Sequence, residues 1–88
     1  GSDYSNMPTV ELTEEQIAES GLRMTDLLVL AKLASSKSDA RRLIEGGGVF
    51  AGDEKVADVK AALPAEKLDG DGIILRKGKK GFCKVRRA

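Results

Sequence analysis

Residues 36–50, which read SKSDARRLIEGGGVF, constrain the fold of this chain more than any other stretch. Ser36 and Asp39 have the Ser-x-x-acid spacing of a capping box, in which two side chains bond to free backbone N–H groups at the start of a helix. A helix is therefore expected to begin at Lys37 and to stop at the three glycines 46–48. The residues that follow the glycines favour an extended strand. The segment thus predicts a short helix that leads directly into a strand.

The predicted helix has one apolar and one basic side. With a rotation of about 100° per residue, three apolar residues fall on one side: Ala40, Leu43 and Ile44. Three cations lie outside this apolar side. Lys37 and Arg41 form an i, i+4 pair at its border, and Arg42 points away from it. Such closely spaced cations repel one another unless an anion is near. The pattern fits either a phosphate-binding helix or the solvated cationic face of an ordinary surface helix.

The charges of the chain are separated along its length, although the net charge is only +1. Residues 1–26 hold six acids and one base, whereas residues 76–88 hold seven bases and no acid. The basic C-terminal end is therefore the candidate partner face. With 88 residues, two Phe, one Tyr and no Trp, the chain is expected to form one small domain with a modest aliphatic core that includes Leu28, Leu43 and Ile44.

The composition argues against several classes of function. One cysteine and no histidine exclude a disulfide framework and a zinc site of Cys/His type within one chain. Catalysis finds no support, because no nucleophile has a histidine partner and the carboxylates are spread over caps and turns. No apolar run approaches the roughly 18 residues of a membrane span and no signal peptide is recognisable. We therefore expect a cytoplasmic protein without a membrane partner.

The first ten residues differ from the rest of the chain. Residues 1–10 are polar and contain one of the two prolines, which is typical of a flexible linker or of residues added for expression. We expect residues 11–88 to form a single domain that carries the basic helix.

Two further helices are expected before the basic one. The residues TEEQ at 13–16 form a second capping-box pattern, which predicts a short acidic helix over 14–20. Thr25 and Asp26 are expected to cap the apolar run 27–33, which is the predicted core helix.

The second half of the chain favours strands and turns. At most one helical turn is expected around 59–63, before Pro64. Two hairpins are expected, with strands over 49–51 and 54–56 and over 73–77 and 80–86. The sequence thus predicts an α+β fold, in which two core helices pack on a small, mostly antiparallel sheet behind an acidic helical lead-in. A DNA-reading helix-turn-helix is disfavoured, because the basic helix stops at glycines instead of continuing along a groove.

Several motifs together resemble a known RNA-binding fold. The dipeptide Leu27-Leu28, the basic run 36–44, the tripeptide at 47–49 and the residues EKV at 54–56 are similar to the small alpha-L RNA-binding domain first described in a small-subunit ribosomal protein. The acidic lead-in at 10–15 and the closing residues LRKGKK at 75–80 extend the similarity to the C-terminal domains of bacterial-type tyrosyl-tRNA synthetases. The chain departs from that pattern at Phe82-Cys83, where a more aromatic ending is usual, which leaves fewer rings for base stacking.

The resemblance implies a tRNA-binding appendage that has no ligase activity by itself. The family grips tRNA(Tyr) near the junction of its long variable arm and the anticodon stem, through shape and phosphate contacts. ATP and magnesium are expected only in the catalytic domain of the parent enzyme, so no cofactor is expected here. The isolated domain is expected to be a monomer, whereas the parent enzyme is expected to be a homodimer.

Ten residues are expected to contact the tRNA, because they match basic or helix-start positions of the family or extend that surface. They are Ser36, Lys37, Ser38, Arg41, Arg42, Lys55, Arg76, Lys77, Lys79 and Lys80.

Two other functions fit the same sequence. One is an RNA-binding module of the same fold from a pseudouridine synthase, a ribosomal protein or a ribosome-associated factor. The other is a protein-interaction domain whose lysine-rich hairpin binds an acidic partner. The lysines of this hairpin also have a purely structural interpretation, because charges on an edge strand prevent edge-to-edge aggregation.

Overall fold

The computed structural model describes residues 8–78 and 81–88. Within these residues the chain forms three α-helices, one short 3₁₀ helix and five strands, which confirms the predicted α+β class. In chain order the elements are β1 (Thr9–Leu12), α1 (Glu14–Ser20), α2 (Met24–Leu30), α3 (Lys37–Glu45), β2 (Val49–Ala51), β3 (Glu54–Lys55), η2 (Ala65–Leu68), β4 (Ile73–Lys77) and β5 (Gly81–Arg87). None of the described helices is long and apolar enough to cross a membrane.

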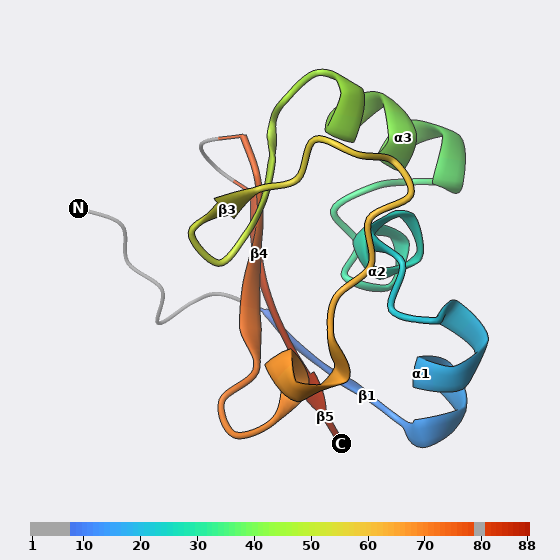
Figure 1. Cartoon of the computed structure of the whole chain (residues 1–88), viewed down its shortest axis with the longest axis vertical. Coiled ribbons are helices and arrows are strands. Elements are labelled where there is room, and N and C mark those ends of the chain that lie inside the picture. The colour runs from blue at the N-terminus through green and yellow to red at the C-terminus, as the bar shows by residue number, and fades with distance from the viewer. Residues whose placement is uncertain (1–7, 79–80) are drawn as a thin grey trace.

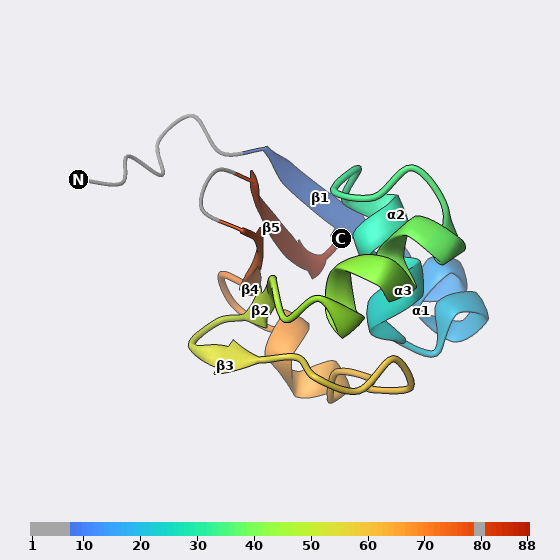
Figure 2. The same ribbon diagram turned by 90° about the horizontal axis from the view of Figure 1, so that it is seen from above.

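The five strands form one sheet in the order β1-β5-β4-β2-β3. All neighbours are antiparallel except β1 and β5, which run parallel, so the sheet is mostly antiparallel as predicted. The three α-helices lie on one side of this sheet, and no described helix covers its other face (Figures 1 and 2). The fold therefore presents two different surfaces, a helical one and the uncovered face of the sheet.

The strand β1 was not expected from the sequence. Its first residues, Thr9 and Val10, belong to the range that the composition predicts as a linker. They pair with Lys84 and Val85 of β5. No local signal announces this pairing, because the partner strand lies at the other end of the chain. The linker prediction for residues 1–7 falls outside the described residues.

The first two helices show one correct and one wrong capping prediction. In α1 both halves of the predicted capping box are present, since Thr13 Oγ1 accepts from Gln16 N at 3.2 Å and Gln16 Oε1 accepts from Thr13 N at 2.9 Å. The helix α2 instead begins at Met24, without a side-chain cap. Its first N–H donates to Ala61 O at 2.9 Å. A distant segment thus satisfies the helix start, and Thr25 is buried inside the helix.

The helix α2 also ends earlier than its apolar run. It stops at Leu30, whereas the pattern predicts a helix to residue 33, because Lys32 takes a left-handed φ of 62°. The N–H groups of Leu33 and Ala34 then both donate to Leu28 O. This tight end returns the chain toward α3, and both Leu33 and Ala34 remain buried.

The core lies between the helices and the sheet. Leu28 and Ile44 are almost completely buried there, as expected, whereas Leu43 is only partly buried and packs at its edge. Burial raises the pKa of the Cys83 thiol, which therefore behaves as a small apolar side chain. Neither phenylalanine belongs to the buried core.

The segment between β3 and β4 contains its helical turn later than predicted. Residues 59–63 are not helical, because Leu63 N donates to Leu22 O at 2.9 Å and Ala62 forms a bridge with Arg23. Residues 58–61 form a single turn, in which Ala61 N donates to Asp58 O at 3.0 Å, and residues 62–63 then run along the start of α2. The helical turn follows Pro64 as η2, whose Leu68 is fully buried.

Candidate nucleic-acid interface

The basic helix α3 begins where the sequence predicts, but its cap differs in one half. Ser36 Oγ accepts from Asp39 N at 3.1 Å, as in a capping box. The carboxylate of Asp39 accepts from Ser35 N at 3.1 Å instead of from Ser36 N. The hydrogen bond between Ser35 and Asp39 ties the preceding loop to the helix. Ser38 is exposed in the first turn. The Ser36 hydroxyl is already engaged by the helix itself.

The lysine at the start of α3 is paired within the chain. Lys37 Nζ lies 3.1 Å from the carboxylate of Asp26 in α2, which also receives a hydrogen bond of 2.9 Å from Arg23 Nε. Partial burial would raise the pKa of Asp26, but the hydrogen bonds from Arg23 and Lys37 outweigh it and hold the pKa below its ordinary value. Lys37 therefore links α3 to α2, although its side chain is 64% exposed and shares this one carboxylate with Arg23.

Replacing Asp26 with Asn is expected to lower the free energy of unfolding by roughly 0.5–1 kcal/mol at neutral pH, because two exposed cations lose their partner. The folded-state pKa of Asp26 is depressed, so its stabilisation is present above the ordinary value of 3.8 and is lost as the pH falls through the folded-state value. Urea unfolding at several pH values measures this effect. The two proteins should converge in acid.

Glu19→Gln is the matched control for this prediction. Glu19 is an exposed acid of α1 that lines a shallow hollow together with Asp26 and Lys37, and it makes no ion pair with a described residue. Its replacement should change the stability by less than about 0.5 kcal/mol at any pH. An equal effect of both substitutions would show that general charge, and not the Asp26 pair, is responsible.

The two arginines of α3 differ from Lys37. Arg41 and Arg42 are both exposed, and neither makes a hydrogen bond or ion pair with any residue in the described ranges. On the buried side of the same helix, Ala40 and Ile44 anchor it against the core. A guanidinium group offers a planar fork of N–H donors that matches two phosphate oxygens. The helix thus presents two unpaired forks on a rigidly anchored element.

The sheet residues expected at the site lie in different places. Lys77 stands opposite Val49 and Gly81, on the helical side of the sheet, and lines a shallow hollow with Ser35 and Asp39 at the start of α3. It therefore extends the helical surface, as expected.

Arg76 does not lie on that surface. Arg76 faces the opposite, uncovered side of the sheet, where its guanidinium carbon lies 4.1 Å from the centroid of the Phe50 ring. Lys55 pairs with Phe50 in the register, and its ammonium group lies beside Gly47, just after α3. The expected contacts are thus divided between two surfaces. Lys79 and Lys80 fall outside the described residues.

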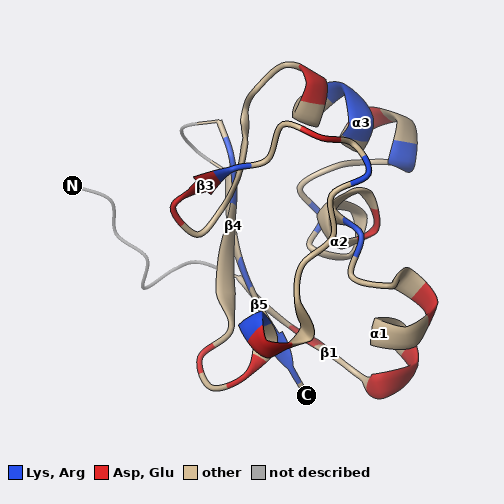
Figure 3. Ribbon diagram, in the orientation of Figure 1, with Lys and Arg blue, Asp and Glu red and all other residues tan. Residues whose placement is uncertain are grey.

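Basic side chains on β5 complete the uncovered face. Lys84 and Arg86 alternate with the buried Cys83 and Val85, so they point away from the core. Figure 3 shows basic positions in blue along β4 and β5. Sequence alternation already places them on one side of the strand, but it does not indicate that this side stays uncovered. They were therefore missing from the expected site.

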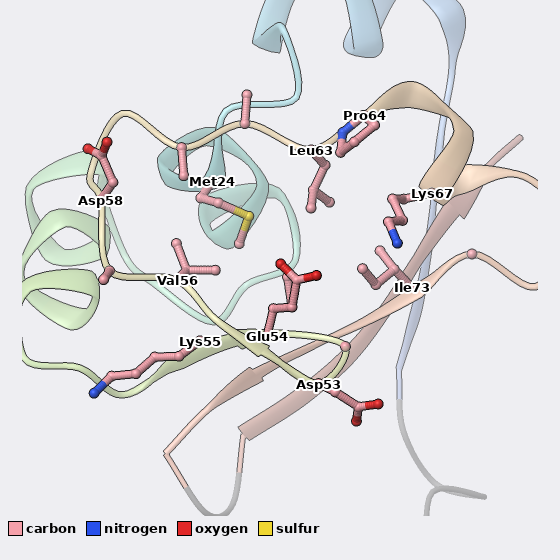
Figure 4. Close-up of a pocket in the computed structure, with 16 residues that line it drawn as sticks. Met24, Asp53, Glu54, Lys55, Val56, Asp58, Leu63, Pro64, Lys67 and Ile73 are labelled. Carbon is pink, nitrogen blue, oxygen red and sulfur yellow. The ribbon is translucent and has the colours of Figure 1, made fainter.

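A hollow beside β3 has the wrong charge for RNA. It has a volume of about 710 Å³ and lies between the β2–β3 turn and the segment 56–64. Its walls combine apolar side chains with Lys67, and the Glu54 carboxylate points into it while Lys55 points away (Figure 4). Asp53 and Asp58 add further negative charge at its rim. This hollow is unsuited to phosphate, and among the described residues no cluster of acids, cysteine or histidine could hold a metal ion.

Comparison with known proteins identifies the family of the chain. The family model described as "Tyrosine--tRNA ligase SYY-like C-terminal domain" matches residues 2–85. The chain belongs to this family. The resemblance inferred from the motifs is therefore confirmed, and the SYY-like C-terminal domain accounts for nearly the whole sequence.

Relatives of the family cover the chain almost completely. The tyrosine–tRNA ligase of Treponema denticola is 48% identical over 86 residues, which are 97% of this chain and 21% of the relative. Tyrosine–tRNA ligases of Clostridium botulinum strain Loch Maree and Clostridium tetani are 41% and 38% identical and are covered over 20% of their length. The chain thus spans about a fifth of the relatives that it matches. It corresponds to the C-terminal domain of such a ligase and does not contain the catalytic domain.

Proposed function

We propose that this domain is the tRNA-binding appendage of a tyrosyl-tRNA synthetase and grips the backbone of tRNA(Tyr) near the anticodon stem and the long variable arm. The unpaired guanidinium groups of Arg41 and Arg42 on α3 are the observation that carries this proposal. The relatives are named tyrosine–tRNA ligases, and tRNA is the polyanion that such an enzyme must hold.

The chemistry of the helical surface favours backbone contacts. Arg41 and Arg42 donate to phosphate oxygens, and Lys77 adds a charge beside the helix start. Ser38 supplies a further donor from the first turn, while Lys37 contributes less because it is paired with Asp26. A surface of this kind recognises the shape and the phosphates of a folded RNA.

The domain positions the tRNA and performs no chemistry. ATP and magnesium act in the catalytic domain of the parent enzyme, and no cofactor binds here. The isolated chain is monomeric, the parent enzyme is a homodimer, and both act in the cytoplasm, where the tRNA is charged.

A titration with four ligands tests the partner. Unmodified protein is mixed with tRNA(Tyr), another tRNA with a long variable arm, a ribosomal RNA hairpin and an acidic protein. Tightest binding of tRNA(Tyr) supports the proposal. Equal binding of all three RNAs favours a general module of the same fold, and preference for the acidic protein favours an interaction domain.

Replacing both Arg41 and Arg42 with Gln is expected to weaken tRNA(Tyr) binding by roughly 1–3 kcal/mol, because two charge-assisted contacts are lost while helix propensity is kept. The stability should scarcely change, since both side chains are exposed. Filter binding at low salt measures the affinity, and thermal unfolding checks the fold.

Two control variants sharpen this test. Replacing both arginines with Lys keeps the charge but removes the planar forks, so an intermediate loss is expected. Lys67→Gln removes an exposed charge from η2, which lies at the other end of the molecule from α3 (Figure 1). If Lys67→Gln weakens binding as much as the double α3 variant, the helix is not the main contact.

A further inference from the structure

Three side chains form a row across the uncovered face of the sheet. Phe50 of β2 stands opposite Arg76 of β4, and Arg76 stands opposite Phe82 of β5. Directly opposed residues of antiparallel strands point to the same face and lie side by side. The row therefore places a cation between the only two phenylalanines of the chain.

The central arginine lies over an aromatic ring. The guanidinium carbon of Arg76 lies 4.1 Å from the centroid of the Phe50 ring, within the range of a cation–π contact. Arg76 Nε is covered and has no hydrogen-bond acceptor within the described part of the chain, so the ring is the contact that orients the group. Stacked aromatic and guanidinium planes are surfaces on which nucleic-acid bases stack.

The charge around the row suits a polyanion. Lys84 stands opposite Ile74 on the same face, and Arg86 follows two residues later on β5. The acid on this face is Glu11 of β1, whose carboxylate lies 3.7 Å from Arg86 Nε. Lys84 makes no ion pair with a described residue. The face thus keeps an excess of positive charge around its aromatic row.

Both phenylalanine rings lie outside the core and are only partly buried. The core is built from aliphatic side chains, methionine and cysteine, and neither Phe50 nor Phe82 contributes to it. Large apolar side chains that gather on a surface, rimmed by polar groups, often mark an interaction site. Their combination with cations distinguishes this face from the acidic hollow beside β3.

We propose that the uncovered sheet face binds single-stranded RNA, with one unpaired base stacked on the Phe50–Arg76 pair and the neighbouring phosphates held by Lys84 and Arg86. Sheet faces with aromatic and basic side chains bind single strands in this way, because every base has a face that can stack. A base inside a duplex is not free to do so. The choice of RNA as the partner rests on the proposed function, but the surface is separate from the forks of α3.

The test compares a single strand with a duplex. Fluorescence anisotropy measures binding of a labelled eight-nucleotide oligouridylate and of a labelled RNA hairpin to the full chain. Phe50→Leu keeps the apolar bulk but removes the ring, and it should weaken oligouridylate binding on the order of tenfold while changing hairpin binding less than about twofold. Arg76→Lys keeps the charge and should act in the same direction. The Arg41→Gln/Arg42→Gln variant is the matched control and should show the reverse preference.

A second measurement does not depend on the variants. In the unmodified protein, oligouridylate should shift the NMR resonances of the Phe50 ring and leave those of α3 unchanged. Thermal unfolding shows whether Phe50→Leu is folded, and if it is not, the resonance shifts decide. The proposal is overturned if oligouridylate does not bind, if it shifts α3 alone, or if polyglutamate shifts the Phe50 ring equally.

The two proposals fail in different ways. If tRNA(Tyr) binds through α3 while oligouridylate leaves the Phe50 ring unchanged, the sheet proposal is wrong and the proposed function stands. If oligouridylate binds at the ring but tRNA(Tyr) is not preferred over other RNAs, the sheet proposal stands and the proposed function is wrong.

Discussion

Replacing Gly72 with Ala is expected to destabilise the domain by about 3–5 kcal/mol, which is most of the stability of a small domain. Gly72 has a φ of +77°, which side-chain-bearing residues rarely adopt, and it lies just before β4. A Cβ atom there would overlap the backbone oxygen of Val85 and lie 2.7 Å from Arg86 Cβ. Chemical unfolding followed by circular dichroism measures the loss.

Gly70→Ala in the same turn is the matched control. Gly70 also has a positive φ, of 65°, but no atom lies within 4 Å of the position of its Cβ. Only the backbone strain of roughly 1–2 kcal/mol is therefore expected. If both substitutions cost the same, the close approach of β5 to this turn is not what makes Gly72 necessary.

The affinity for tRNA(Tyr) is expected to fall by about two to three orders of magnitude between 50 and 200 mM salt, if four to six phosphates are neutralised. The described cations that lack an acidic partner include Arg41, Arg42, Lys77 and Lys84, which supports a number in this range. Binding isotherms at several salt concentrations give the slope of log K against log salt. The expected slope is roughly −4 to −5.

The double variant of α3 provides the internal check on this slope. Loss of two phosphate contacts should make the slope shallower by about 2. Phe50→Leu should leave the slope unchanged, since it removes no charge. A flat dependence for the unmodified protein would contradict electrostatic binding and favour an apolar or protein partner.

Local sequence signals predicted the elements whose cause is local. The start of α3 at Lys37 follows from Ser36, and both halves of the α1 cap are formed by residues three positions apart. The strands of the two hairpins likewise follow from short alternating runs between turn residues. The motifs in these same segments were sufficient to indicate the family, which the comparisons confirm.

Features that depend on contacts between distant residues could not be predicted from the local sequence. The helix α2 begins at Met24 because Ala61 accepts its first N–H, so the Thr25 cap expected from the sequence is not used. Lys37 matched the basic pattern of the helix, yet Asp26 pairs with it across the α2–α3 packing. A charge pattern by itself does not show which cations are compensated inside the chain.

The sequence by itself determined the capping box of α1, the start of α3, the hairpins, the separation of charge and the family. Only the tertiary structure decided which face each cation occupies, because that depends on the register and order of strands far apart in the chain. Phe50, Arg76 and Phe82 become neighbours solely because β2, β4 and β5 lie side by side. The rings of Phe50 and Phe82, which are few for base stacking, thus lie in one row on a face of the sheet that no described helix covers (Figure 2).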